Sequence, residues 1–316
     1  MTDEIKLGIS SCLLGYKVRY DGGHKLDHFL CDTLGQYVKF VPVCPEVECG
    51  FSVPREPFRL EGRCESPRLV TVRTKEDFTD FMVEWAKERV RQLEKENLCG
   101  FIFKSKSPSS GMERVKVYNE NGILEKRGRG IFAGLFIEYF PRIPVEEDGR
   151  LHDPQLRENF IERIFTLKLW RDTLSVDITI GNLVDFHTKQ KLLLLSHSPK
   201  HLTEMGKLVA RAKEMDTKDL YEQYEGLLTE ALKLKSTVKK NTNVLQHIMG
   251  YFKRQLSTDE KQELLEIING YHDGLVPLIV PITLVNHYVR KYQQPYLMQQ
   301  TYLNPHPMAL KLRNHV

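Results

Sequence analysis

Three short apolar segments in the first half of the chain each end in residues that could do chemistry. They are IKLGISS at 5–11, which leads into Cys12, YVKFVPV at 37–43, which leads into Cys44-Pro-Glu46, and CGFIFKS at 99–105, which leads into the loop Ser107–Ser110. If these segments are parallel strands, their carboxyl ends open on one crevice, so we expect the three loops to converge. Two thiols, a carboxylate and several hydroxyls would then face a common space.

The thiols by themselves leave two explanations open. All six cysteines precede residue 100, at Cys12, Cys31, Cys44, Cys49, Cys64 and Cys99. A disulfide framework is not expected in a reducing compartment, so they are buried thiols or part of a metal site. Zinc sites usually show two close cysteine pairs, whereas only Cys44 and Cys49 are suitably spaced here. Similarly, Glu46 is either a general base in a desolvated crevice or a salt-bridged acid.

The elements around these residues predict an α/β domain with a mainly parallel sheet. Buried strands alternate with helical patterns, of which the amphipathic stretch at 75–97 is the longest. Glycines around the run IFAGLF indicate close backbone packing. The segment PRIPVEEDGRLHDP, at 141–154, is rich in proline and charge and predicts a linker, and residues 157–170 predict a bridging helix.

The second half has an almost entirely helical pattern. Helical periodicity is found at 191–215, 220–234, 243–256, 258–274 and 276–292. Thr258 and the two acids after it have the composition of a helix N-terminus. We therefore predict an α/β domain at 1–145, a linker and bridging helix at 146–164, and an all-α helical domain at 165–316.

Composition is that of a two-domain globular protein. The chain has 316 residues, of which 41% are hydrophobic and 28% charged, so long disorder is not expected. The first residues, MTDEIKLGIS, do not resemble a secretory signal, and no run approaches the roughly 18 apolar residues of a membrane span. We expect a cytoplasmic protein with no membrane association and no obligatory protein partner.

Several motifs resemble known families. SSCLLGYKVRYDGGHK at 10–25, VCPE at 43–46 and KSKSPSSG at 104–111 are similar to the motifs of the thiouracil desulfurase (TudS) family, an α/β domain that holds a [4Fe-4S] cluster. DFHTKQKLLLLSHSPK at 185–200, NVLQHIMGYFK at 243–253 and PLIVPITLVNHYVRKY at 277–292 resemble the YbgA-like helical domain. The pairing resembles two-domain proteins of the RudS type, which remove sulfur from 4-thiouridine in tRNA.

The resemblance implies a cluster site from which this chain departs. In the family three cysteines bind three irons, and the fourth iron is open to the substrate's sulfur. By motif, Cys12 and Cys44 are two ligands, and Ser110 occupies the third position. A serine hydroxyl is harder and far less acidic than a thiol, so we expect a weakened or absent cluster. Cys49 could replace the missing thiol only if a loop shifted.

The resemblance also implies a non-redox mechanism. Glu46 would activate the water that attacks the ring carbon, and sulfur would be released as hydrogen sulfide. Ser107 is the catalytic serine by position, for proton transfer or orientation of the ring, and capping of the next turn is the alternative. Residues expected to bind the substrate are Arg19, Asp21, His24, Lys104, Ser105 and Ser109.

Basic clusters in the second half predict contacts with RNA phosphates. They comprise Lys239, Lys240, Lys253, Arg254, Arg290 and Lys291, with Tyr251, Phe252, Tyr288 and Tyr292 interleaved for base stacking. Together with the resemblance, they predict a [4Fe-4S]-dependent desulfurase of 4-thiouridine in tRNA, impaired by Ser110. The alternatives are a desulfurase of free thiouracil or thionucleosides and a non-catalytic RNA-binding protein.

Overall fold

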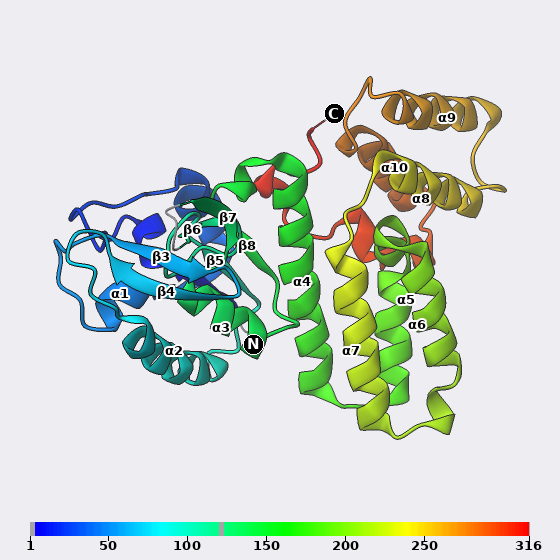
Figure 1. Cartoon of the computed structure of the whole chain (residues 1–316). Helices are drawn as coiled ribbons and strands as arrows, with labels where there is room; N and C mark the ends of the chain where they lie inside the picture. The colour runs from blue at the N-terminus through cyan, green and yellow to red at the C-terminus, as the bar shows by residue number, and fades with distance from the viewer. Residues whose placement is uncertain (1–3, 120–122, 316) are drawn as a thin grey trace. The chain divides into compact units, whose positions relative to one another are not determined.

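The computed structural model describes residues 4–119 and 123–315, and the chain divides into two compact units after Asp153 (Figure 1). The first unit contains all the strands, and the second is helical. This confirms the predicted fold class. None of the helices in the described ranges is long and apolar enough to cross a membrane.

The first unit is built on a four-stranded sheet with the order β2-β1-β5-β8. Its strands are β1 (Ile5–Ser10), β2 (Val38–Val43), β5 (Gly100–Phe103) and β8 (Val145–Glu147). All neighbours pair in parallel, and the register places Ser10 beside Val43 and Ile9 beside Ile102. The predicted strands therefore end together at one edge of the sheet.

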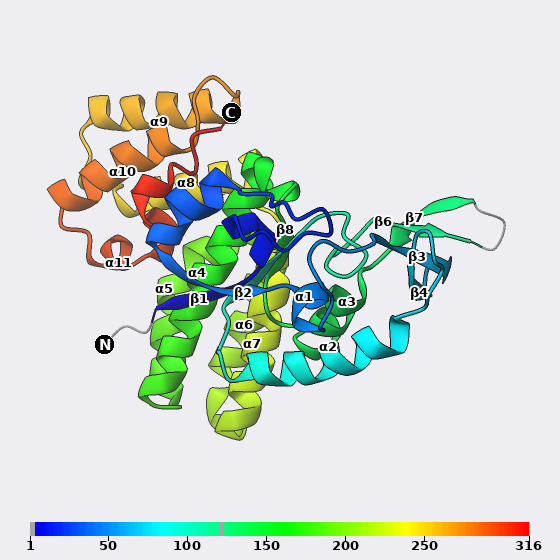
Figure 2. The same cartoon turned by 90° about the vertical axis from the view of Figure 1, so that its left-hand side faces the viewer.

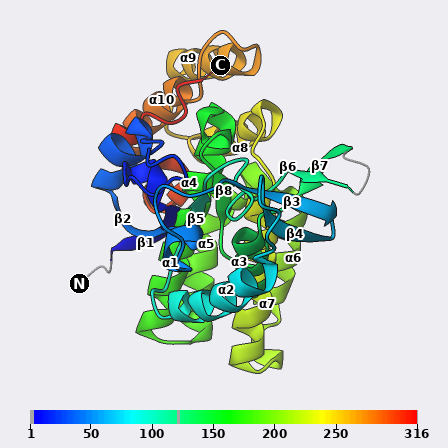
Figure 3. The same ribbon diagram turned by 60° about the vertical axis from the view of Figure 1, so that its left-hand side comes forward.

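Two helices pack side by side against this sheet (Figure 3). They are α2 (Thr79–Glu94) and α3 (Ile131–Tyr139). The ring of Phe101 on β5 lies 4.7 Å from that of Phe136 and 5.8 Å from that of Phe132, both on α3. The predicted helix at 75–97 is confirmed over a shorter range, because Lys75 and Asn97 at its predicted ends have positive φ, which is incompatible with a right-handed helix.

A second sheet in this unit was not predicted from the sequence. Its order is β4-β3-β6-β7, with β3 (Phe58–Arg63), β4 (Ser66–Thr71), β6 (Val115–Tyr118) and β7 (Leu124–Gly128). Two antiparallel pairs, β3–β4 and β6–β7, are joined by parallel pairing of β3 with β6 (Figure 2). Charged residues occupy much of these strands, so their apolar pattern is too weak to stand out.

The segment predicted as a linker is part of the first unit. Strand β8 extends the parallel sheet by pairing Phe101 with Val145. A 3-10 turn, Arg150–His152, follows it, and helix α4 (Pro154–Val176) begins the second unit. The sequence predicts a linker and a bridging helix at 146–164; in the structure the chain divides after residue 153, and the bridging helix predicted at 157–170 lies within α4 of the second unit. Burial of Glu146 and Glu147 shows that their charges do not mark exposed chain here.

The second unit contains α4 and a series of further helices. These are α5 (Ile180–His197), α6 (Pro199–Ala210), α7 (Thr217–Lys233), α8 (Val238–Tyr251), α9 (Thr258–His272), α10 (Ile279–Lys291) and α11 (Pro295–Met298). Helices α4 to α7 stand side by side around Trp170, whose ring stacks on Tyr224 with centroids 5.2 Å apart (Figure 1). The N-cap of α9 is Ser257, which forms a capping box with Glu260.

Shorter helical segments connect the main elements. They are α1 (Pro45–Glu48), the 3-10 turns Ser11–Leu14, Leu34–Gln36, Ala212–Glu214, Thr301–Leu303 and Met308–Leu310, and a π-helical turn at Phe29–Thr33.

The serine loop after β5 is anchored on the N-terminus of α3. The N–H of Gly130 donates to the carbonyl of Gly111 at 2.8 Å, and the N–H of Phe132 donates to the carbonyl of Ser109 at 2.9 Å. These N–H groups have no partner within their own helix, so the loop satisfies them. A Cβ at Gly130 would lie 2.6 Å from the backbone carbon of Ser109. Glycine is therefore required for this close approach.

We expect Gly130→Ala to lower the free energy of unfolding of the first unit by about 1–3 kcal/mol, because backbone must move to admit the methyl group. Gly134→Ala on the same helix is the control, since its Cβ would lie 3.5 Å from the flexible side chain of Arg129. That change should stabilise by up to about 1 kcal/mol. Urea titration followed by fluorescence measures both through Trp85, with Trp170 of the second unit replaced by phenylalanine in every variant. Equal effects of the two changes would contradict the tight contact.

Candidate active site

The loops at the carboxyl ends of β1, β2 and β5 line one pocket of about 640 Å³. Cys12 follows β1, Cys44 and Glu46 follow β2, and the loop from Ser105 to Ser110 follows β5. The N–H of Lys104 donates to the hydroxyl of Ser10 at 2.9 Å, which ties the ends of β1 and β5 together. The structure thus brings residues nearly 100 positions apart into one cavity.

A chain of hydrogen bonds runs through the serine loop to Glu46. The Ser109 hydroxyl donates to Oε1 of Glu46 at 2.8 Å, and it lies 3.1 Å from the hydroxyl of Ser107. Because Ser109 has one proton and gives it to the carboxylate, Ser107 must be the donor in the contact between the serines. Ser107 in turn accepts the N–H of Ser110 at 3.1 Å. In this series of hydrogen bonds, the N–H of Ser110 and the hydroxyls of Ser107 and Ser109 therefore all donate in the direction of Glu46.

The second oxygen of Glu46 is held by Arg55, which was not identified from the sequence. Arg55 donates to Oε2 from Nε at 2.9 Å and also from Nη2, and the two side chains are only 6% and 14% exposed. The guanidinium further donates to the carbonyls of Val18 and Ser52. Glu46 is therefore both salt-bridged and the end of a hydroxyl chain. No motif marks Arg55, which lies nine residues along from Glu46.

Burial favours the neutral form of the two pocket thiols. Burial raises the pKa of Cys12 to about 11, although the cations of Lys104 and Arg19 oppose this. Burial also raises the pKa of Cys44, whose Sγ lies 3.9 Å from the carbonyl of Val18. Neither thiol is thus activated as a nucleophile, and binding a metal would require its deprotonation.

The donor set matches a three-thiolate cluster site only in part. Cys12, Cys44 and the buried Ser110 line the same pocket, as the cluster assignment requires. The third donor is a hydroxyl, which is a poor substitute for a thiolate at iron. Cys49 does not supply the missing sulfur, because its side chain packs in an apolar cluster below β3 with Sγ 3.9 Å from the carbonyl of Phe81.

Within residues 4–119 and 123–315, no group of three His, Cys, Asp or Glu side chains is arranged to hold a metal. In the described part of the chain, this pocket provides two thiols and the Ser110 hydroxyl where the cluster assignment needs three thiolates.

Lys104 is fixed by Asp148, a second residue that the sequence did not single out. The ammonium lies 2.8 Å from Oδ2 of Asp148 and 3.0 Å from the hydroxyl of Ser105. Burial alone would raise the pKa of Asp148, but Lys104 and the N–H of Ser105 lower it below its ordinary value. Asp148 lies in the segment predicted as a linker, and only pairing of β8 with β5 brings it to the pocket.

The residues predicted to bind the substrate have two different positions. Arg19, Lys104, Ser105 and Ser109 line the pocket. Asp21 and His24 are outside its lining and order the loop instead, since Asp21 accepts the N–H of Gly23 at 3.0 Å and His24 accepts that of Leu26 at 3.2 Å.

The lining is strongly cationic. Its positive side chains are Arg19, Lys25, Arg55, Lys104 and Lys106, of which Arg19 pairs with Asp21, Arg55 with Glu46 and Lys104 with Asp148. The remaining positive charge is that of Lys25 and Lys106. This balance favours an anionic ligand.

The predicted RNA-binding residues of the second unit differ in whether the protein itself already provides a partner for their charge. Lys240 donates to the carbonyls of His197 and Lys235, and Lys291 forms a 2.7 Å salt bridge with Glu260. The remaining cations, Lys239, Lys253, Arg254 and Arg290, are exposed. The prediction of base stacking is wrong for Phe252 and Tyr288, because both side chains are buried in the helical core.

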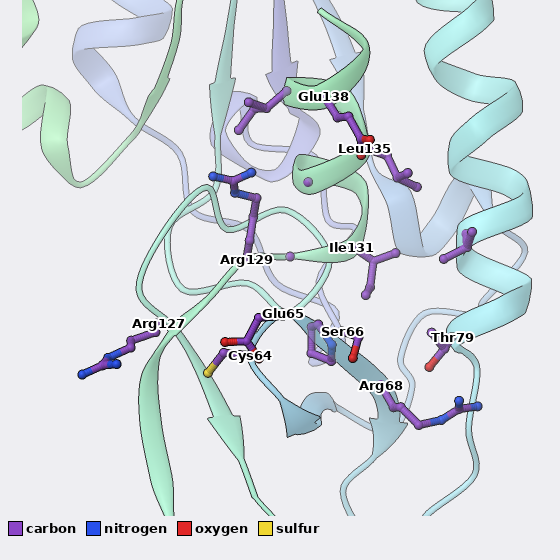
Figure 4. Close-up of a pocket in the computed structure, with 15 residues that line it drawn as sticks. Cys64, Glu65, Ser66, Arg68, Thr79, Arg127, Arg129, Ile131, Leu135 and Glu138 are labelled. Atoms are coloured by element: carbon purple, nitrogen blue, oxygen red, sulfur yellow. The ribbon is translucent and has the colours of Figure 1, made fainter. Parts of the chain in front are cut away.

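A larger pocket of about 810 Å³ in the first unit contains none of the predicted site residues (Figure 4). It lies between the β3–β4 hairpin, which contributes Cys64, and α3, which contributes Ile131. The Sγ of Cys64 lies 3.5 Å from the carboxylate of Glu125, and burial together with this carboxylate raises the pKa of the thiol. The larger pocket therefore does not coincide with the predicted site residues, and the pocket of about 640 Å³ that contains Cys12, Cys44 and Glu46 is the candidate active site.

Comparison with known proteins identifies each half of the chain. The 2-thiouracil desulfurase family matches residues 7–148, and the family described as "Protein of unknown function (DUF1722)" matches residues 191–307. YbgA of Escherichia coli (strain K12) is 31% identical over 153 residues, which are 48% of this chain and 90% of YbgA. YbbK of Bacillus subtilis (strain 168) is 32% identical over 146 residues, which are 44% of this chain and 95% of YbbK.

Among solved structures, the [4Fe-4S]-dependent thiouracil desulfidase TudS is 28% identical, with a TM-score of 0.39 over 48% of this chain and 95% of that one. The two family matches do not overlap, and each agrees with the motifs in its half of the sequence. The chain therefore belongs to the 2-thiouracil desulfurase family in its first half and to the YbgA-like DUF1722 family in its second.

Proposed function

We propose that this protein removes sulfur from 4-thiouridine in tRNA and produces uridine and sulfide. The family match supports desulfuration of a thiolated uracil. The observation that carries the proposal is the pocket in which Cys12, Cys44 and the Glu46 hydrogen-bond chain meet. Its volume, about 640 Å³, is within the usual range for small-molecule sites. Its cationic lining suits the phosphates that flank a nucleotide.

The reaction needs no net electron transfer. Water supplies the oxygen that replaces sulfur at the ring carbon, and sulfur leaves as sulfide, so that C=S and water give C=O and hydrogen sulfide. A proton must leave the attacking water. The hydroxyls of Ser107 and Ser109 point towards Glu46 and provide a route for that proton, while Arg55 fixes the carboxylate that receives it.

The second unit would bind the RNA. A thiolated base inside folded tRNA must be extruded into the pocket, and its unstacking costs a few kcal/mol. Exposed cations such as Lys253 and Arg254 are suited to phosphate contacts that supply this energy.

We also propose that Ser110 impairs the site, because a [4Fe-4S] cluster bound at Cys12 and Cys44 would lack its third thiolate. A bound cluster would polarise the carbon–sulfur bond as a Lewis acid. The incomplete donor set favours one second candidate, an RNA-binding protein of the same family without turnover.

A comparison of substrates tests the assignment to tRNA. Turnover of thiolated tRNA should exceed that of free 4-thiouridine by at least tenfold in kcat/KM, because the second unit contributes binding only to the polymer. Sulfide release measured in parallel for both substrates gives the ratio. Equal rates would contradict the tRNA assignment and favour free thiouracil or a thionucleoside. Tight tRNA binding without sulfide from either substrate would favour the non-catalytic candidate.

Ser110→Cys should complete the donor set. After anaerobic reconstitution with iron and sulfide, we expect this variant to gain bound iron, visible absorbance and sulfide release relative to the wild type. Ser105→Cys is the matched control, because it adds a thiol to the same pocket at a hydroxyl that Lys104 holds. If both variants, or neither, gain iron, Ser110 is not the third ligand position.

Ser109→Ala should interrupt the path to Glu46. We expect kcat to fall by about 10²-fold or more with little change in KM, since general base catalysis contributes roughly 10²–10⁴-fold. Steady-state sulfide release measures this in whichever background turns over, the wild type or Ser110→Cys. The control is Ser52→Ala, whose hydroxyl donates to the carbonyl of Pro54 outside the pocket lining. An unchanged kcat in Ser109→Ala would exclude the proton path.

A further inference from the structure

The second unit contains a cavity of its own, of about 540 Å³. Glu158 of α4 and Tyr271 of α9 line it, together with the chain from Lys235 to Lys239, which enters α8. Its volume is within the range of small-molecule sites. None of its lining residues belongs to the candidate active site.

Three polar side chains in the lining are more than nine-tenths buried, namely Glu158, Asn241 and Tyr271. The amide of Asn241 donates to the hydroxyl of Tyr271 at 3.2 Å and accepts that of Tyr302 at 3.1 Å. Tyr271 is thus an acceptor towards Asn241, so its own proton is available to another group. Burial and the nearby Glu158 carboxylate raise the pKa of Tyr271, which keeps that proton in place.

Glu158 supplies a carboxylate to the same wall. Its Oε2 accepts the backbone N–H of Arg313 at 3.0 Å and lies 3.7 Å from Nδ1 of His315, which also lines the cavity, and its Oε1 lies 3.6 Å from Nε of Arg313. Burial and the neighbouring carboxylate of Glu162 raise the pKa of Glu158 above its ordinary value, although Arg313 opposes them. Further hydrogen-bond donors would therefore stabilise the charged form of this carboxylate.

The exposed part of the lining carries positive charge. Lys235 and Lys239 are both exposed at the start of α8. Thr237 accepts the N–H of Lys240, and the ammonium of Lys240 donates to the carbonyl of Lys235, so this stretch is held in place. The cavity thus combines a buried acceptor and donor with cations at its rim, which suits a ligand with an anionic group and a polar planar edge.

We propose that this cavity binds a guanine nucleotide. The guanine N1–H and N2 amino group are adjacent donors for the lone pairs that the two oxygens of Glu158 retain beside their contacts with Arg313 and His315, and O6 beside them can accept the proton of Tyr271. Uracil offers one donor between two carbonyl groups, and adenine and cytosine present an acceptor next to their amino group, so each fits this wall less well. Lys235 and Lys239 would contact the phosphate.

Titration calorimetry on the full chain tests the site with guanosine 5′-monophosphate (GMP) and three related probes. Inosine 5′-monophosphate, which lacks only the 2-amino group, should bind about tenfold more weakly, because one hydrogen bond to a charged acceptor is lost. Guanosine should also bind more weakly than GMP, and uridine 5′-monophosphate should not compete with GMP. No binding of GMP, or equal affinity for all four, would overturn the proposal.

Three variants assign the contacts. Glu158→Gln and Tyr271→Phe should weaken GMP binding by about tenfold and fivefold. Lys239→Ala should weaken GMP but not guanosine. The control is Lys261→Ala, an exposed lysine of α9 outside the lining. If Glu158→Gln unfolds the second unit through the loss of its contact with Arg313, the GMP affinities of Tyr271→Phe and Lys239→Ala still test the site. Unchanged affinity in both would overturn the site.

The source of the nucleotide is a separate question. A short single-stranded RNA with one guanosine, and the same strand with inosine, can be competed against GMP. Tighter binding of the guanosine strand, displaced by GMP, identifies guanosine within RNA as the ligand, and binding of GMP alone identifies a free nucleotide. Binding of both strands equally and without competition by GMP would count against a guanine site. These measurements need no sulfide release, so they can fail or succeed independently of the desulfuration.

Discussion

Parallel pairing of β1 with β2 and with β5 is the constraint on which the active site depends. Strands that run the same way deliver the loops that follow them to one edge of the sheet, and here those loops carry Cys12, Cys44 and the serine segment. The register matters as much as the direction, because a shift of one residue would turn each side chain to the opposite face. Strand β5 is buried on both faces, and its apolar packing holds it in the sheet without any contribution from the candidate catalytic groups.

Polar contacts then fix the positions of the pocket side chains, which the sheet alone does not determine. The N-terminus of α3 holds the serine loop, Arg55 holds Glu46, and Asp148 holds Lys104. Each contact joins two different segments of the first unit and removes a charge or a backbone dipole from water. Buried charges are costly unless paired, so these pairs keep the side chains in single positions while leaving the centre of the pocket open to a ligand.

Ser110 has two separable roles in this arrangement. Its backbone N–H orients Ser107 and thereby the hydroxyl chain to Glu46, whereas its side chain occupies the position of a cluster ligand in the resemblance. A change of side chain at this position alters the donor set without removing the backbone contact. In the proposed mechanism, the proton path and the third cluster ligand are therefore separable, although both belong to the segment Ser107–Ser110.

The two-unit organisation, the parallel strands and the motif residues from Cys12 to Ser110 could be predicted from the sequence, because apolar runs and compact motifs are local patterns. It also indicated tRNA and the basic clusters through resemblance and charge, which remain predictions. Only the tertiary structure disclosed Arg55, Asp148, the second sheet and strand β8, and showed that Lys240 and Lys291 already have partners. The partner of a side chain depends on which segments come together in the folded protein. The periodicity of a single segment contains no information about that.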